Sequence, residues 1–288
     1  MLSVAAVKRF KTVIVDVSNA YLHASLQQPV FIRIPPFLPQ GGKVVKLRKA
    51  LYGLKQSGSA WHDELKGTLF HFGFTQSIVD ACLFVNNNVY IGVYVDDLLI
   101  TGKEEAVTPI ISKLSGKFPI KVKGLDSMTD FLGIDLEDCE QGFKMTMETY
   151  INKMSKPFPN VNERRCPIGT ERLSEKSDPQ NPFPASEYAH IVGQLLWVSL
   201  TVRYDIAFSV KELSKFLQQP SLAHYRAAMR VVGYLKKTSK LGILFPREPT
   251  FPEQPTGVDI SKFQGNRYGY SIIDSPIEHG KLQDNSIH

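Results

Sequence analysis

Two adjacent carboxylates, Asp96 and Asp97, stand between two apolar runs in the stretch YIGVYVDDLLITG. Because successive side chains of a strand point to opposite faces, neighbouring aspartates can serve one site only at a bend. The flanking runs predict two strands, with Asp96 and Asp97 as the two-residue loop of a tight hairpin. A carboxylate held beside apolar strands is costly unless hydrogen bonds or a cation compensate its charge. The stretch therefore predicts a metal site, with a solvent-exposed turn as the alternative.

A third carboxylate, Asp16, ends the strand-like run TVIVD and precedes a short helical stretch. It could cap that helix, but Ser18 and Asn19 can fill the same role. Three carboxylates from two strand ends suit Mg²⁺, which prefers oxygen ligands and binds jointly with substrate phosphates. Two such ions about 4 Å apart can activate an attacking hydroxyl and stabilise a leaving pyrophosphate. If folding brings Asp16 to the pair, the acids predict a nucleotidyl transferase.

Strand-like and helix-like stretches alternate around these acids. Short β-branched runs predict strands, and apolar residues recurring every three or four positions predict helices. Strands are expected over 11–17, 30–34, 82–85, 89–95, 98–102, 129–138 and 142–148, and helices over 59–74, 107–118 and 149–158. A helical region is expected from about 186 to 240.

Composition divides the chain into three parts. Residues 1–150 carry the three acids, and residues 151–245 are mainly helical, with a linker over 159–186 that is rich in Pro, Asn, Ser and charge. Residues 246–288 are first Pro-rich and then polar without a sustained period, so we expect a degenerate, partly disordered tail.

The global composition indicates an intracellular protein. The 288 residues are 43% hydrophobic and 22% charged, and no run approaches the roughly 20 apolar residues that a membrane span needs. Three scattered cysteines suit neither a disulfide framework nor a zinc site with close ligand pairs. The first ten residues have the wrong order of basic and apolar residues for a signal peptide.

The positive charge is concentrated between residues 203 and 240, which hold eight basic and two acidic residues, so their net charge equals the +6 of the whole chain. Arg226, Arg230 and Lys237 share one face of the expected helix, opposite an apolar face. Such a cationic stripe suits a polyanion such as nucleic acid. An ordinary solvated helix face is the alternative.

Five stretches, taken in order, resemble the reverse transcriptase of copia-type LTR retrotransposons, and together they span about residues 4–245. They are VIVDVSNAYLHASL, KLRKALYGLKQSGSAW, YVDDLLITG, DFLGIDL and YDIAFSVKELSKFLQQPSLAHYRAAMRVVGYLKKTS. YVDD alone is a weak motif, whereas five blocks in family order are highly specific.

The resemblance implies an α+β fold: a polymerase palm of the ferredoxin-like βαββαβ type with partial fingers, followed by a mainly helical thumb or connection region. Asp16 and Asp96 match the two main metal ligands of the family, and Asp97 supports them. The implied cofactor is a pair of Mg²⁺ ions, with Mn²⁺ as a substitute. The implied partners are an RNA or DNA template–primer and deoxynucleoside triphosphates.

Further residues match binding positions of the family. Tyr21 matches the aromatic gate that excludes a 2′-hydroxyl, and Gln56 matches the glutamine that lines the nucleotide pocket. Phe131, Leu132 and Gly133 match the hairpin that grips the primer. The alternative for Tyr21, Phe131 and Leu132 is an ordinary place in the core. The cationic face described above would then be turned to the duplex.

Departures from the family pattern weaken the expected activity. Only fifteen residues precede Asp16, so the basic fingers segment is missing, and only 43 residues follow Phe245, too few for a full RNase H domain. The sequence thus predicts a polymerase fragment that is weak or inactive alone. We expect it either in the cytoplasm, in a virus-like particle, or in the nucleus. A non-catalytic nucleic-acid-binding remnant is the alternative, and an unrelated metal-dependent phosphoesterase is a third hypothesis. The oligomeric state is open.

Overall fold

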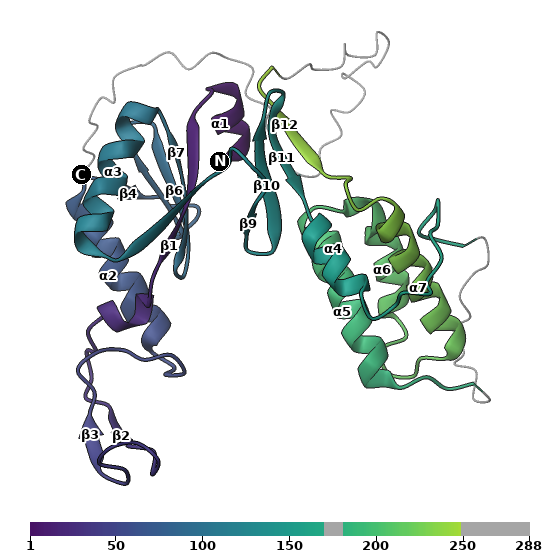
Figure 1. The fold of residues 1–288 in the computed structure, drawn as a ribbon, viewed down its shortest axis with the longest axis horizontal. Coiled ribbons are helices and arrows are strands. Elements are labelled where there is room, and N and C mark those ends of the chain that lie inside the picture. Colours follow the sequence, from purple (N-terminus) through teal and green to yellow (C-terminus); the bar gives the residue numbers. More distant parts are fainter. Residues whose placement is uncertain (170–180, 249–288) are drawn as a thin grey trace, which may run out of the picture. The chain divides into compact units, whose positions relative to one another are not determined.

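A computed structural model of the chain describes residues 1–169 and 181–248, which form antiparallel sheets and helices (Figure 1). The expected α+β class is therefore confirmed. Within these residues, no helix combines the length and apolar character needed to cross a membrane. Part of the expected linker, residues 170–180, and nearly all of the expected tail, residues 249–288, lie outside the described residues.

The larger sheet has six strands in the order β4-β5-β6-β7-β1-β8, and every neighbouring pair is antiparallel. Its strands are β1 (Lys11–Val17), β4 (Thr75–Gln76), β5 (Leu83–Asn86), β6 (Val89–Tyr94), β7 (Asp97–Gly102) and β8 (Ile120–Gly124). Helix α2 (Ser57–His71) lies between β1 and β6 in sequence, and α3 (Glu104–Lys117) lies between β7 and β8. In chain order this layer is β1, α2, the four strands β4 to β7, α3 and β8; β1, α2, β6, β7, α3 and β8 among them follow a βαββαβ order, with β1 between β7 and β8.

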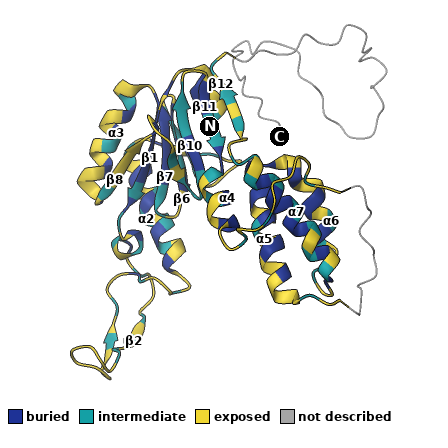
Figure 2. Ribbon diagram, turned by 45° about the vertical axis from the view of Figure 1, so that its right-hand side comes forward, coloured by how far each residue is buried: buried dark blue, intermediate teal, exposed yellow. Residues whose placement is uncertain are grey.

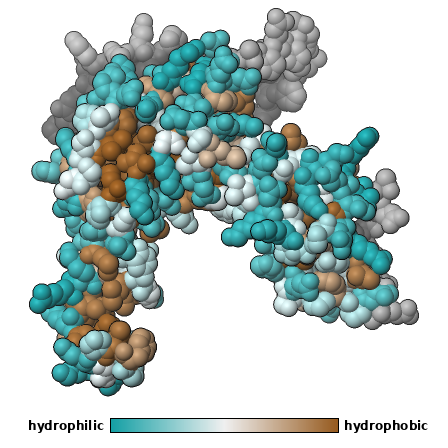
Figure 3. Space-filling model, viewed as in Figure 1, coloured by the Kyte–Doolittle hydropathy of each residue, from teal (hydrophilic) through white to brown (hydrophobic). Residues whose placement is uncertain are grey.

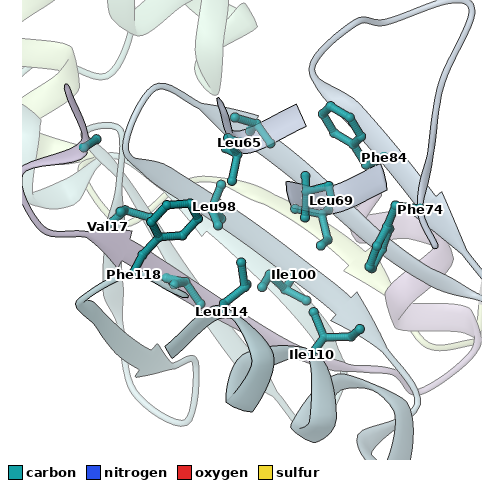
Figure 4. Packing of buried hydrophobic residues seen from close by; sticks show 14 of the residues in the cluster. Val17, Leu65, Leu69, Phe74, Phe84, Leu98, Ile100, Ile110, Leu114 and Phe118 are labelled. Atoms are coloured by element: carbon teal, nitrogen blue, oxygen red, sulfur yellow. The ribbon is translucent and has the colours of Figure 1, made fainter. Parts of the chain in front are cut away.

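Both helices bury an apolar stripe against this sheet. In α2 the residues Trp61, Leu65 and Leu69 recur every four positions and are almost fully buried, which is the spacing of one helix face. Figure 4 shows Leu65 and Leu69 of α2 beside Leu98 and Ile100 of β7, with Ile110, Leu114 and Phe118 closing the same core. Burying each large aliphatic side chain contributes about 1.5–3 kcal/mol. This core fixes β1 against β7, the strands that carry the predicted acids.

The smaller sheet has the order β12-β11-β10-β9. Its strands are β9 (Thr129–Phe131), β10 (Ile134–Cys139), β11 (Gly142–Thr146) and β12 (Ile243–Pro246). With α1 (Leu2–Val7) they build a second core, in which Phe10, Ile14 and Leu99 of the N-terminal region and larger sheet meet Leu136 and Phe143. Residues on the face of the larger sheet away from α2 and α3 are therefore also buried.

The remaining helices form a core of their own. They are α4 (Glu148–Ser155), α5 (Ala185–Thr201), α6 (Ala207–Ser214) and α7 (Leu222–Lys237), with the 3₁₀ turn η2 (Tyr204–Ile206) before α6. Figure 2 shows α5 and α7 dark blue where they are buried and yellow on their exposed faces. The expected helical region over 186–240 is confirmed.

A hairpin of β2 (Phe31–Arg33) and β3 (Val44–Lys46) forms a separate two-stranded sheet. It leaves several apolar side chains exposed, and Figure 3 shows brown atoms gathered over it: Phe31, Phe37, Leu38 and Val44. An isolated hairpin in water is marginally stable at best. The contacts within this hairpin are its ladder and a bond from the Arg33 side chain to the Gly42 carbonyl oxygen.

The sequence reading was wrong in several details of the strands, and β3, β4 and β12 were not expected. The expected single strand over 129–138 is broken at Leu132 and Gly133, whose φ angles of 59° and 78° turn the chain between β9 and β10. Strand β8 was also not expected, because IKVKG is short and contains two lysines; it forms the edge of the sheet by pairing with β1, and Ile120 packs against the core. Helix α1 was also not predicted.

Candidate active site

Strand pairing places Asp16 beside the hairpin that carries the other two acids. Asp16 of β1 is the direct partner of Asp97 of β7, and residues opposite each other in an antiparallel pair share a face of the sheet. The backbone N–H of Val17 donates to the Asp96 carbonyl oxygen at 2.8 Å, which continues the contact to the loop. The proximity that the sequence argument requires is therefore present.

The loop of the hairpin is one residue away from its expected position. Tyr94 pairs with Asp97, so the two loop residues are Val95 and Asp96 rather than Asp96 and Asp97. Val95 has a φ of 53°, the positive value that a two-residue hairpin needs at its first loop position. That value is unfavourable for a β-branched residue. As a result Asp97 stays in the ladder opposite Asp16, and Asp96 stands at the tip.

A buried tryptophan ties this tip to α2. The Trp61 indole N–H donates to the Val95 carbonyl oxygen at 2.6 Å, and the Trp61 ring lies edge-on to Phe118, with 5.2 Å between ring centroids. Only 1% of Trp61 is exposed. The place of Trp61 in the apolar stripe of α2 is visible in the sequence, but its hydrogen bond to the loop has no signal there. The strained loop is thus held by the helix beneath it.

The three carboxylates repel one another. The pKa of Asp97 is raised, first by burial and then by the negative charges of Asp96 and Asp16, while Lys123 acts in the opposite direction. Close like charges disfavour ionisation. A bound cation would relieve this repulsion, so the electrostatics and the carboxylate oxygens both fit a divalent metal.

The acids do not form a ready-made cage. Among residues 1–169 and 181–248, no group of three or more His, Cys, Asp or Glu side chains is arranged to hold a metal ion on its own. Mg²⁺ does not require such a cage, because it usually keeps waters and is bound by one or two carboxylates together with substrate phosphates. Asp16, Asp96 and Asp97 are the residues that would hold it.

Two tyrosines lie next to the acids. Tyr21, in the 3₁₀ turn η1 (Ala20–His23), is half-buried, and its ring centroid lies 4.5 Å from that of Tyr52 at an interplanar angle of 52°. The pKa of Tyr52 is raised by burial, then by the Asp96 charge, Tyr21 and Asp16. Tyr52 was not among the residues predicted from the sequence, although it lies within the block LYGLKQ.

Gln56 is not brought into this group by any described contact. It is exposed at the N-terminal end of α2 and lines a cleft of about 460 Å³. The other residues of the cleft are Leu26, Gln27, Gln28, Lys55, Ser59, Ala60 and Asp63. Neither Tyr21 nor an acid of the hairpin lines it.

Phe131, Leu132 and Gly133 form the end of β9 and its turn into β10. Phe131 is half-buried against the second core, so it also has a packing role. Close by in sequence, the buried Asp135 carboxylate accepts a hydrogen bond from the Thr149 backbone N–H at 2.9 Å, which fixes the first turn of α4.

The cationic face of α7 is only partly available to a ligand. Arg226 and Lys237 are exposed, whereas Arg230 is half-buried and its Nε lacks a hydrogen-bond partner. Arg203, counted in the basic region, is 2% exposed and makes a bidentate pair with Asp205. Treating Arg203 as part of a surface charge was therefore wrong, because its charge is neutralised inside the protein.

Comparison with known proteins decides the family. Residues 1–171, more than half of the chain, match the family model described as reverse transcriptase (RNA-dependent DNA polymerase). The chain belongs to this family. Its relatives place this reverse transcriptase with those of copia-type retrotransposons, as the sequence blocks indicated.

Two plant relatives and one from yeast illustrate the similarity. The chain is 35% identical to the retrovirus-related Pol polyprotein from transposon RE1 of Arabidopsis thaliana over 82% of its own length, and 28% identical to that from transposon TNT 1-94 of Nicotiana tabacum over 83%. It covers only 16% and 19% of those polyproteins. It is also 29% identical to the putative transposon Ty5-1 protein of Saccharomyces cerevisiae, over 78% of this chain and 76% of that protein.

Proposed function

We propose that this reverse transcriptase chain contains a polymerase palm that adds deoxynucleotides to a primer on an RNA or DNA template by two-metal nucleotidyl transfer. The observation that carries the proposal is the pairing of Asp16 with Asp97 at the tip that holds Asp96. The βαββαβ order of β1, α2, β6, β7, α3 and β8 within the larger sheet supports its assignment as the palm. The helices from α4 to α7 are the proposed thumb or connection region.

The carboxylates are assigned the metal-binding role. Asp16 and Asp96 would be the main ligands of two Mg²⁺ or Mn²⁺ ions, with Asp97 in support. When bound, such ions stabilise the attacking primer oxygen and the leaving pyrophosphate. The contribution of the chain is to hold the acids on neighbouring strands, with Trp61 fixing the loop, so that little reorganisation is needed when the substrate binds.

The remaining predicted residues are assigned to substrate binding. The Tyr21 ring, beside the acids, would lie under the sugar of the incoming nucleotide and clash with a 2′-hydroxyl. Gln56 would reach the nucleotide from the edge of its cleft. The turn at Phe131, Leu132 and Gly133 would contact the primer end.

Nucleic acid is assigned to the exposed cations of α7. Arg226 and Lys237 are available to phosphates as they stand, and Arg230 would have to turn outward. The proposed setting is intracellular, in a cytoplasmic particle or the nucleus.

Primer extension tests the proposal. On a poly(rA) template with an oligo(dT) primer, dTTP and Mg²⁺, we expect slow incorporation by the wild-type chain and a loss of at least about 100-fold in Asp96→Asn, because a lost metal ligand removes charge stabilisation worth several kcal/mol. Equal incorporation by both proteins would contradict the assignment of Asp96.

Binding measured in parallel separates the alternative. If neither protein incorporates dTTP, but both bind the template–primer equally and in a salt-dependent way, the chain is a non-catalytic nucleic-acid-binding remnant instead.

A further inference from the structure

We propose that Tyr52 is a positioning residue for nucleotide selection: its ring supports the Tyr21 ring, so that the pair excludes a 2′-hydroxyl better than Tyr21 alone. This inference rests on the proposed function, because it assigns a partner to the residue that faces the sugar. It adds a residue that neither spacing nor a matched motif position had indicated.

The contact between the rings is direct. Their centroids lie 4.5 Å apart and their planes are tilted by 52°, within the range of favourable aromatic pairs. Tyr21 sits on η1, a single 3₁₀ turn of four residues. Such turns have poorer hydrogen-bond geometry than an α-helix, so the position of the Tyr21 ring depends on what packs beside it.

The backbone presents Tyr52 at a fixed corner. The Leu54 N–H donates to the Leu51 carbonyl oxygen across a turn in which Gly53 has a φ of 92°, the value that a type II turn requires at its third residue. The Ser57 hydroxyl donates to the same Leu51 oxygen. The turn is thereby anchored to the start of α2.

Ala50, the residue before this turn, ties the turn to the segment that follows Tyr21. The Ala50 N–H donates to the Ala24 carbonyl oxygen at 3.0 Å, and both alanines are fully buried. Tyr52 and Tyr21 therefore come from two segments that are joined by a backbone hydrogen bond, which keeps the two rings in register.

Tyr52 has no role in the core that would explain its position. The residue is 56% exposed, although a tyrosine that served only to pack would be expected inside. Its surroundings are the acids and Tyr21: the negative charges of Asp96 and Asp16 contribute to its raised pKa, after burial. An exposed aromatic ring that contacts Tyr21 and feels the charges of Asp96 and Asp16 would border the space that the sugar occupies.

The test is the ratio of kcat/KM for dTTP to that for UTP on poly(rA) with an oligo(dT) primer. We expect Tyr52→Ala to lower this ratio roughly 3- to 10-fold, the size of one aromatic contact. Tyr52→Phe keeps the ring and is expected to stay within about twofold of wild type. A purely structural role would lower both rates together and leave the ratio unchanged.

Tyr204→Ala is the matched control, because Tyr204 is 59% exposed and lies in η2, outside the proposed palm. Its ratio should equal that of the wild type. An unchanged ratio in Tyr52→Ala would overturn the inference, and so would an equal loss in Tyr52→Phe, which would assign selection to the hydroxyl instead of the ring.

A binding measurement separates this inference from the proposed function. With a dideoxy-terminated primer and Ca²⁺, calorimetry gives the affinities for dTTP and UTP without chemistry, and their ratio should change in the same way. If the wild-type chain neither incorporates nor binds dTTP, the proposed function fails and the inference with it. If it does either and Tyr52→Ala keeps the wild-type ratio, only the inference fails.

Discussion

At the scale of single residues, Asp97 is placed where its charge is unfavourable. It faces Asp16 across the ladder and follows Asp96 directly. Its raised pKa means that the folded protein holds this proton more tightly than the unfolded chain does. Ionisation of Asp97 therefore lowers stability as the pH rises from the ordinary aspartate pKa of about 4 through the raised value.

The first prediction concerns this charge. Asp97→Asn should raise the free energy of unfolding of the metal-free protein at pH 7 by roughly 0.2–1 kcal/mol, because like charges opposite each other in a ladder destabilise it. Urea unfolding measures the change. At pH 3, where the carboxyl is protonated in both states, the gain should vanish. Asp63→Asn, at an exposed position of α2, is the control and should change little. A loss of stability in Asp97→Asn would contradict the account.

Sequence reasoning predicted that the three acids lie near one another, but it missed two details of their surroundings. The proximity of Asp16 to the acid pair could be predicted, because strand ends and charges are visible in the pattern. The loop position could not, since it depends on the positive φ of Val95 and the hydrogen bond from Trp61. Tyr52 was missed for a similar reason: it lies 31 residues after Tyr21 in the sequence, and their contact arises only when the chain folds.

At the scale of elements, Arg203 after α5 links the end of α5 to the end of α7, because it pairs with Asp205 and also hydrogen-bonds to Thr238. Arg203 donates to both carboxylate oxygens of Asp205, and also to the carbonyl and hydroxyl oxygens of Thr238. Tyr234 donates to Asp205 as well. Burial alone would raise the pKa of Asp205, but the hydrogen bonds from Arg203 and Tyr234 outweigh it and lower the pKa.

The second prediction follows from this pair. Asp205→Asn leaves the buried Arg203 without its charge partner, and at pH 7 it should lower the free energy of unfolding by on the order of 2–3 kcal/mol, less than for a fully buried pair because solvent reaches Asp205. The stabilisation that comes from a lowered pKa is fully present above the unfolded pKa of about 4. It is lost as the pH falls through the lower pKa of the folded state. The difference between variant and wild type should therefore shrink below pH 4 in urea unfolding.

Glu248→Gln provides the control for this pair. It removes the exposed partner of Arg9, whose side chain is 67% exposed while that of Glu248 is 87% exposed. Such surface pairs are worth little. A loss of stability in Glu248→Gln equal to that in Asp205→Asn would show that charge number, rather than the internal pair, determines the effect.

The long, periodic elements were predictable and the short ones were not. The helices α2, α3 and α7 have clear apolar stripes, and β1, β6 and β7 are rich in β-branched residues. Strands β8 and β12 have weak patterns and form because β1 and β11 offer free edges to pair with. Their existence is a property of the fold rather than of their own sequences.

At the scale of the whole molecule, the net charge of +6 is carried by one region. Between residues 203 and 240, the Arg203–Asp205 and Lys215–Glu212 pairs cancel, so six basic residues provide the surplus: Lys211, Arg226, Arg230, Lys236, Lys237 and Lys240. A polyanion bound there would release counterions, which makes affinity fall with salt.

The third prediction tests this surface. The double variant Arg226→Gln with Lys237→Gln should weaken template–primer binding and reduce the slope of log K against log salt by about 1–2, because each phosphate contact contributes about one unit. Fluorescence anisotropy over a salt series measures the slope. The control, Lys113→Gln with Lys117→Gln on α3, removes the same charge elsewhere. Equal slopes in the two double variants would contradict a local binding face.

The chain belongs to the reverse transcriptase family and spans 16% of the RE1 polyprotein. We propose that Asp16, Asp96 and Asp97 hold divalent ions together. Electron paramagnetic resonance of free Mn²⁺, titrated with the chain and a template–primer, tests it most directly. We predict that Asp16→Asn weakens Mn²⁺ binding at least about 10-fold, while Asp130→Asn, which removes a nearby charge, has a much smaller effect. Equal Mn²⁺ affinity in the wild type and Asp16→Asn would contradict the account.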